Sequence, residues 1–246
     1  MYPGFTSKKA SVILFAGILL LQIIPCMAHG QGQPNFVQDD FQHKINLYDV
    51  NGLPIGNDAV ETKGSPLFTV KWKLGWIRLA DSRLFPGVML RLDLEKQVVH
   101  YKRADGNDIE VEPGRVKELA ILDTVDGAEV AYQFSCGYQP IGNQSETSFY
   151  LVLDSGRVSF LESLRKVMRQ EKDAISGDSR REYKLYNDFY VYNQGKMSRI
   201  KKDTKFFLDL TNDKHDQMED YLNKNKISFR SMEDIRQFIH YYNGLP

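Results

Sequence analysis

Residues 88–95 read Val-Met-Leu-Arg-Leu-Asp-Leu-Glu and form the clearest strand pattern in the chain. Apolar side chains alternate there with mostly polar ones: Val88, Leu90, Leu92 and Leu94 against Met89, Arg91, Asp93 and Glu95. This period of two is typical of a β-strand that buries one face and exposes the other to water. The stretch therefore predicts a sheet that covers a core with one of its faces.

Short turn sequences separate similar alternating segments along the chain, at 95–97, 105–106, 113–114, 126–127, 154–157 and 193–196. Strands joined by such tight turns pair antiparallel with their neighbours. Before residue 88, the alternation from Val70 to Trp76 changes phase at Gly75, which indicates a bulge or a turn. The sequence therefore predicts an antiparallel β-meander, either a curved sheet or a partial barrel.

One segment, residues 161–175, fits two structures. Leu161, Leu164 and Val167 are spaced as on a helix, yet the segment directly continues a strand. A helix and a long edge strand therefore both remain open for these residues.

The end of the chain changes from a period of two to spacings of three and four. Two sets of apolar residues mark amphipathic helices: Met218, Tyr221 and Leu222 in one, Ile235, Phe238, Ile239 and Tyr242 in the other. Ser231 and Asp234 match a capping box for the second helix, and Asn243-Gly244 supplies its end. Strands followed by helices predict one α+β domain over residues 64–246, with two or three short helices at its end.

The first 28 residues have the order of an export signal. Lys8 and Lys9 precede an apolar run over residues 10–21. Pro25 interrupts the helix that such a run would form, and Ala28 is a small residue suited to cleavage. We therefore expect cleavage after Ala28 and a mature protein in the periplasm or outside the cell.

Two alternatives to cleavage are a retained membrane anchor and a lipid anchor on Cys26. The apolar run is short for a membrane span, and the residues before Cys26 are bulky for a lipoprotein signal. Residues 29–63 are polar and rich in turn residues, which predicts an irregular segment before the domain.

The charge balance bears on the class of partner. The chain has 32 basic and 32 acidic residues, and cleavage would remove only two of the basic ones. This balance argues against nucleic-acid binding, which normally requires a basic surplus. No later stretch approaches membrane length, so we expect no membrane span after cleavage.

Cleavage would leave Cys136 as the only cysteine, which excludes an internal disulfide bond. Cys136 is in phase with Val130, Tyr132 and Phe134 on an expected strand. We therefore interpret it as a residue that faces the core, with a reactive thiol as the alternative.

The sequence lacks the usual catalytic and metal-binding motifs. Five histidines are scattered without metal-ligand spacing: His29, His43, His100, His215 and His240. No nucleophile elbow, phosphate-binding loop or zinc-protease helix occurs. We therefore predict no cofactor and no metal, and we favour a noncatalytic protein.

Two pairs of acids have a spacing that glycosidase or calcium chemistry could use. Asp93 and Glu95 lie two residues apart, as do Glu110 and Glu112, so each pair shares one strand face. These positions belong to the face expected to meet water, so solvated surface acids are the simpler interpretation. The basic cluster at 165–181 is interleaved with acids, which is typical of a mixed solvated face.

Aromatic residues crowd one short stretch: Tyr183, Tyr186, Phe189, Tyr190 and Tyr192. Exposed rings can stack on a sugar or grip a peptide, so the set is a possible ligand platform. The alternation of Tyr190 and Tyr192 also fits a buried strand face. The five aromatics are therefore interpreted either as part of the core or as a ligand platform.

Both halves of the chain contain motifs of turn residues and core aromatics. They are Gly64-Ser65-Pro66-Leu67-Phe68, Trp72, Gly75-Trp76-Ile77, Leu90-Arg91-Leu92-Asp93, Phe149-Tyr150-Leu151-Val152-Leu153, Phe189-Tyr190-Val191-Tyr192-Asn193-Gln194-Gly195 and Tyr241-Tyr242-Asn243. Over nearly the whole mature chain, this set resembles a group of exported Bacteroidota proteins of unknown function. The resemblance implies export and a shared fold, and it supplies no catalytic residues. Where many of those proteins have a glycine turn, this chain has Asp81-Ser82-Arg83.

These features predict an exported, noncatalytic binding or accessory structural protein of the envelope, with an envelope protein or a glycan as its partner. Two alternatives stay open. A curved sheet with helices could enclose an apolar cavity and carry a lipid or a lipoprotein. Carboxylates brought together only by folding could instead form a hydrolase.

Overall fold

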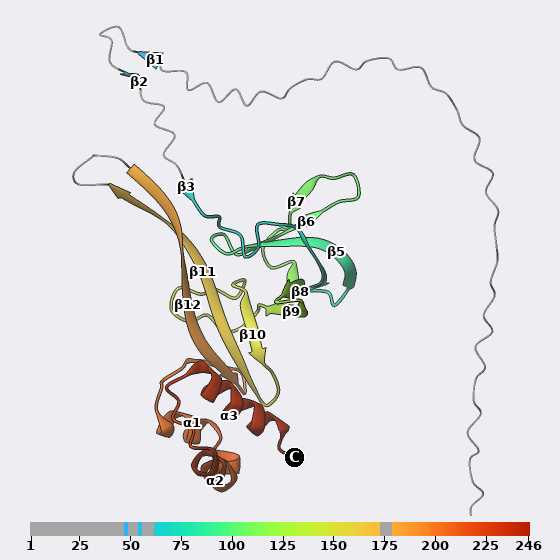
Figure 1. Cartoon of the computed structure of the whole chain (residues 1–246). Coiled ribbons are helices and arrows are strands. Elements are labelled where there is room, and N and C mark those ends of the chain that lie inside the picture. The colour runs from blue at the N-terminus through green and yellow to red at the C-terminus, as the bar shows by residue number, and fades with distance from the viewer. Residues whose placement is uncertain (1–46, 49–53, 56–61, 173–178) are drawn as a thin grey trace, which may run out of the picture. The chain divides into compact units, whose positions relative to one another are not determined.

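A computed structural model of the chain describes residues 47–48, 54–55, 62–172 and 179–246 (Figure 1). The chain divides into two compact units, residues 1–56 and 57–246. In the first unit, β1 (Leu47–Tyr48) pairs antiparallel with β2 (Pro54–Ile55). The expected export signal at 1–28 lies outside the described residues and stays a prediction.

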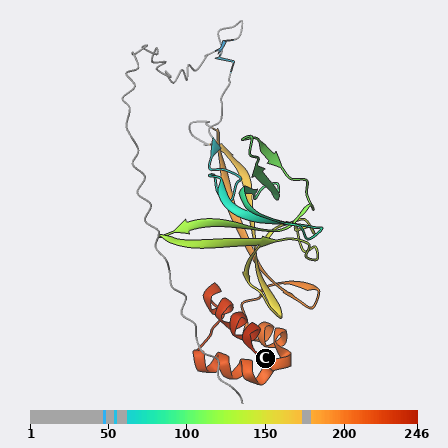
Figure 2. The ribbon, with the colours of Figure 1, turned by 90° about the vertical axis from the view of Figure 1, so that its right-hand side faces the viewer.

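The second unit is built on one eleven-stranded sheet that does not close into a barrel. Its strands are β3 (Thr62–Lys63), β4 (Lys73–Leu79), β5 (Leu84–Asp93), β6 (Val98–Lys102), β7 (Asp108–Glu110), β8 (Val116–Val125), β9 (Ala128–Ser135), β10 (Tyr150–Asp154), β11 (Val158–Lys172), β12 (Ser179–Asn193) and β13 (Lys196–Arg199). Neighbouring strands pair antiparallel, apart from the short parallel contact of β3 with β12. Three helices follow the sheet (Figures 1 and 2), which confirms the predicted α+β class.

The strand order departs from a simple meander at one point. It runs β13-β12-β11-β10-β9-β8-β4-β5-β6-β7, so β8 pairs with β4 and not with β7, which precedes it in the chain. β7 has three residues and lies at the edge of the sheet beside β6. The sheet therefore consists of two meanders, β4–β7 and β8–β13, joined along β4 and β8.

The segment that fitted two structures is a strand. β11 pairs with β12 residue by residue, from Val158 opposite Asn193 to Lys172 opposite Ser179. A partner strand of the same length satisfies the backbone of β11 throughout, and this outweighs the helical spacing of its apolar side chains. The helix interpretation is therefore wrong for 161–172, and residues 173–175 lie outside the described part of the chain.

The strand pattern at 88–95 is confirmed in β5, with one exception. Leu90, Leu92 and Leu94 are almost completely buried, as the alternation predicted. Asp93 was expected on the wet face, but it is only 5% exposed. Its carboxylate accepts hydrogen bonds from the backbone N–H groups of Glu95 and Lys96, each at 2.8 Å. The turn that follows β5 thus supplies the partners that a buried acid requires.

The buried face of β4 is the one that carries Gly75 and Ile77, and not the one that carries Leu74. Gly75 and Ile77 are buried, whereas Leu74 is 49% exposed. A Cβ atom on Gly75 would overlap the carbonyl oxygen of Ala120 on β8, so glycine alone permits this close approach of the strands. The expected bulge is present, because the pairing with β5 shifts between Gly75 and Trp76 and leaves Gly87 as the extra residue.

Gln97 ties the β5–β6 turn to β11 and to the residue that precedes β10. Its side-chain amide donates to the carbonyl oxygens of Leu94 and Leu164, at 3.0 Å and 3.1 Å. Its Oε1 accepts from the N–H of Phe149 at 2.9 Å. The N–H of Lys166 on β11 also donates to the Leu94 carbonyl oxygen, at 3.2 Å. These bonds draw the curved sheet together around the core formed by Leu90, Leu92, Leu119, Ile121 and Phe134.

The helices α1 (Thr204–Leu210), α2 (His215–Asn225) and α3 (Met232–Gly244) form a second core with the ends of β11 and β12. The predicted apolar stripe of α3 is buried there: Ile235, Phe238, Ile239 and Tyr242. At its start, the Ser231 hydroxyl accepts from the N–H of Asp234 at 3.0 Å. The Asp234 carboxylate accepts from Ser228 instead, so half of the predicted capping box forms.

Asn243 docks the end of α3 onto the β10–β11 hairpin. Its amide nitrogen donates to Asp154 at 2.7 Å and to the carbonyl oxygen of Val158 at 2.9 Å. Its amide oxygen accepts from the N–H of Val158 at 3.0 Å, so the side chain pairs with β11 as a strand would. His240, expected to be solvated, has an 80% exposed side chain and also contacts Asp154 at 2.8 Å.

We expect Phe238→Ala to lower the free energy of unfolding by about 3–5 kcal/mol, because truncating a buried aromatic leaves a cavity. Phe238 is completely buried, and its ring centroid lies 5.8 Å from that of Phe207 and 5.0 Å from that of Phe229. Urea and thermal denaturation measure the change. His240→Ala is the control, because the His240 side chain is 80% exposed and substitutions at the surface usually change stability by about 0.5 kcal/mol or less. Equal effects of the two substitutions would contradict the role of α3 as part of the core.

Candidate functional site

A groove of about 760 Å³ lies at one edge of the first core. Its floor is apolar and consists of Ile77, Leu79, Val88, Tyr101, Val111 and Val116. These residues come from β4, β5, β6, β8 and the segment between β7 and β8. The groove therefore exists only after the two meanders have joined.

Pro86 and Gly87 explain why β5 has a free edge beside this groove. β6 pairs with β5 only from Met89 to Asp93, so within the described chain the residues before Met89 have β4 as their partner strand. Proline lacks an N–H donor and is tolerated at such an edge. Gly87 adopts a φ of +69°, which suits the extra residue of a bulge. Phe85 therefore stays 42% exposed at the groove.

Three cations, Lys102, Arg103 and Arg115, line the same groove, and no acidic side chain does. Arg103 has a partner in Asp105, at 3.6 Å. The side chains of Lys102 and Arg115 form no hydrogen bond or ion pair with any other residue that the structure describes. The groove thus combines an apolar floor with positive charge at its margin.

The Asp81-Ser82-Arg83 sequence forms a tight turn between β4 and β5, close to this margin. Ser82 takes the left-handed conformation, with a φ of 69°, that a glycine would adopt easily. The Asp81 carboxylate accepts from the backbone N–H and the side chain of Arg83. The hydrogen bond from the Arg83 side chain lowers the pKa of the Asp81 carboxyl, and the charge of Arg115 adds a smaller effect in the same direction. Asp81 is therefore committed to Arg83.

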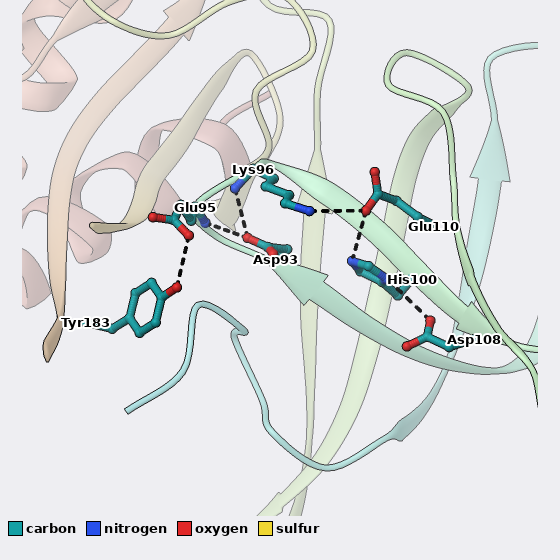
Figure 3. Close-up of polar contacts among 7 residues, drawn as sticks. All are labelled: Asp93, Glu95, Lys96, His100, Asp108, Glu110 and Tyr183. Atoms are coloured by element: carbon teal, nitrogen blue, oxygen red, sulfur yellow. Dashed lines mark hydrogen bonds and ion pairs between the residues drawn. The ribbon is translucent and has the colours of Figure 1, made fainter. Parts of the chain in front are cut away.

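A second polar group connects β5, β6 and β7 on the other face of the sheet (Figure 3). His100 Nδ1 lies 3.3 Å from Asp108, and His100 Nε2 lies 3.9 Å from Glu110. Glu110 also pairs with Lys96 at 3.6 Å. Arg91 on β5 also lies 3.8 Å from Asp108, so the acids of β7 have partners on β5, on β6 and in the turn between them. In the part of the chain that the structure describes, no group of His, Cys, Asp or Glu is arranged to hold a metal ion.

The two acid pairs singled out in the sequence do not converge. Asp93 is occupied by the backbone of the β5–β6 turn, while Glu95 accepts from the hydroxyl of Tyr183 at 3.2 Å (Figure 3). Glu110 belongs to the ionic group, and Glu112 is exposed after β7. None of the four lines the groove.

The five aromatic residues of β12 are divided between the two faces of the strand. Tyr190 is buried, and it packs with Tyr192 into a third cluster that also contains Tyr138 and Tyr150. Phe189 points to the opposite face, where its ring lies 6.0 Å from Phe160 in the helical core.

The other two rings of that set are closer to water. Tyr186 is 37% exposed beside Arg169, and Tyr183 reaches Glu95 on the opposite face from Tyr186. The five rings therefore do not share one surface, because successive strand residues point to opposite sides. The interpretation of Tyr190 as a core residue is confirmed.

Sequence reasoning missed the groove. Its residues are spread from 77 to 116. A period of two identifies the buried face of a strand, but it does not show where a groove forms beside that strand. The one local signal is Phe85-Pro86-Gly87, where an aromatic precedes a residue that cannot donate to a neighbouring strand.

Comparisons with known proteins add no relative from which a site could be transferred. No family model, curated protein or solved structure matches the chain. The resemblance to exported Bacteroidota proteins therefore stays a prediction.

We expect the thiol of Cys136 to be nearly inert in the folded protein. Its Sγ is buried and lies 3.2 Å from the carbonyl oxygen of Val116, and burial raises the pKa of the thiol. In a Cys26→Ser variant, modification by a thiol reagent at pH 8 should be on the order of 100-fold slower than in guanidinium, because reaction requires local unfolding. Comparable rates in the two conditions would contradict a core position for Cys136.

Proposed function

We propose that this chain is an exported, noncatalytic binding protein that holds an apolar ligand in the groove beside β5. The groove carries the proposal: it has a volume of about 760 Å³ and an apolar floor, and Phe85 lies at its margin. Small-molecule sites commonly have volumes of about 300–1,000 Å³, and the mouths of barrel-like sheets are frequent places for them.

The energetics favour an apolar occupant. Leu79, Val88 and Tyr101 are only partly buried by the core beneath them, so a ligand can cover what remains exposed. Each Å² of apolar surface removed from water contributes about 25 cal/mol. The partly exposed ring of Phe85 can close over such a ligand and add to that area.

Binding in an open groove fits the structure better than the two alternatives from the sequence. A carrier that encloses its cargo needs an empty interior, but Leu90, Leu119 and Ile121 are completely buried in the core below. A hydrolase built on carboxylates needs acids that face the substrate. The acids considered above have other partners or lie away from the groove.

We expect the exported form to begin near His29, because the basic residues, the apolar run, Pro25 and Ala28 follow the order of a cleaved signal. Amino-terminal sequencing of protein recovered from outside the cytoplasm tests this expectation. A chain that retains residues 10–21 there would contradict cleavage and favour a retained anchor.

We expect the neutral apolar dye Nile red to bind the purified chain saturably, and Phe85→Ser to weaken this binding about tenfold or more. The exposed ring supplies apolar contact at the groove, and losing the burial of a large apolar side chain costs about 1.5–3 kcal/mol. Fluorescence titration measures the dissociation constant.

Leu122→Ser is the matched control for Phe85→Ser. Leu122 is also 42% exposed but does not line the groove, so its substitution should leave the dissociation constant within about twofold. Because both side chains are exposed, neither substitution should unfold the protein. Equal losses in the two variants, or the absence of saturable binding, would overturn the proposed function.

A further inference from the structure

The positive margin of the groove indicates the charge of the ligand. Lys102 and Arg115 are both exposed, both line the groove, and neither has an ion-pair partner among the described residues. Asp81 pairs with Arg83 and Asp105 with Arg103, while Asp108, which lies opposite Lys102 in the β6–β7 ladder, contacts His100 and Arg91. Two cations without a direct ion pair, beside an apolar floor, are complementary to an anion attached to an apolar body.

We infer that the ligand is an acyl lipid with an anionic head group, whose chain lies on the apolar floor while Lys102 and Arg115 bind the charged group. This inference rests on the proposed function and specifies its ligand. The apolar floor and the cations have different roles, as in other ligand pockets, where apolar walls provide affinity and a few polar groups fix orientation.

The placement of the cations supports a head group at the margin and not within the groove. Lys102 ends β6, and Arg115 immediately precedes β8, so both lie where strands meet turns. Long basic side chains there can hold an anion while the anion keeps part of its hydration. A lipid that entered the groove with its charged end first would place that charge against Ile77 and Val116, where its desolvation is unfavourable.

A comparison of hexadecanoic acid with hexadecanol, both below their aggregation limits, tests the inference. The two compounds have the same chain length and differ in charge at neutral pH. Displacement of Nile red from the purified chain should show the acid binding about tenfold more tightly, since two partly exposed ion pairs give a factor of this size. The preference should shrink as salt is added, because exposed charges are screened.

Matched variants assign the preference to the two cations. Lys102→Gln combined with Arg115→Gln should bring the acid to the affinity of the alcohol and leave binding of the neutral dye within about twofold. Lys196→Gln combined with Arg230→Gln removes the same charge from exposed positions outside the groove, and it should preserve the preference.

The outcomes separate this inference from the proposed function. If the acid and the alcohol bind equally, or if neither displaces the dye, the anionic lipid is wrong, while dye binding that depends on Phe85 still supports the groove. A preference that survives Lys102→Gln/Arg115→Gln overturns the role of the two cations. If the unsubstituted protein does not bind the dye saturably, both the proposed function and this inference are wrong.

Discussion

Gln97 provides the hydrogen bonds through which an open sheet encloses a core. Its amide joins the β5–β6 turn to Leu164 on β11 and to Phe149 just before β10. An antiparallel sheet of this size has a strong natural twist, and its edges would separate without contacts across the opening. With the turn fixed to β11, Leu90, Leu92 and Phe134 form one buried cluster. The half-buried amide has partners on both its oxygen and its nitrogen, so this contact carries no penalty for an unpaired polar group.

Among the residues that the structure describes, β5 before Met89 pairs on one side only, with β4. Pro86 cannot donate to a neighbouring strand, and Gly87 adds an extra residue opposite Gly75 and Trp76. The apolar residues that would otherwise be covered become the floor of the groove. The features that end regular pairing in β5 are therefore the ones that create a surface suited to a ligand. The broken strand pairing thus exposes an apolar recess, which the crowded aromatics of β12 do not form.

Two other features that attracted attention in the sequence have structural explanations. The aromatics of β12 contribute to the tyrosine cluster and to the helical core, one on each face of the strand. The acids of β5 and β7 are bound to turn backbone or to cations of neighbouring strands. Neither the aromatics nor the acids place several unpaired side chains around one common site. The cations of the groove differ from both, because Lys102 and Arg115 are not paired with any described residue.

The sequence by itself determined much of the local structure of the described chain. Alternation located the strands and the buried faces of β5 and β9, and three-and-four spacing located α2 and α3, because a side chain's period depends only on its own backbone. The tertiary structure alone decided that β8 lies beside β4, that β11 is a strand as far as Lys172, and that Asp93 is buried. It also decided that residues between 77 and 116 form one groove with cations at its margin. These outcomes depend on contacts between segments distant in the chain, and local periodicity does not specify which segments will meet.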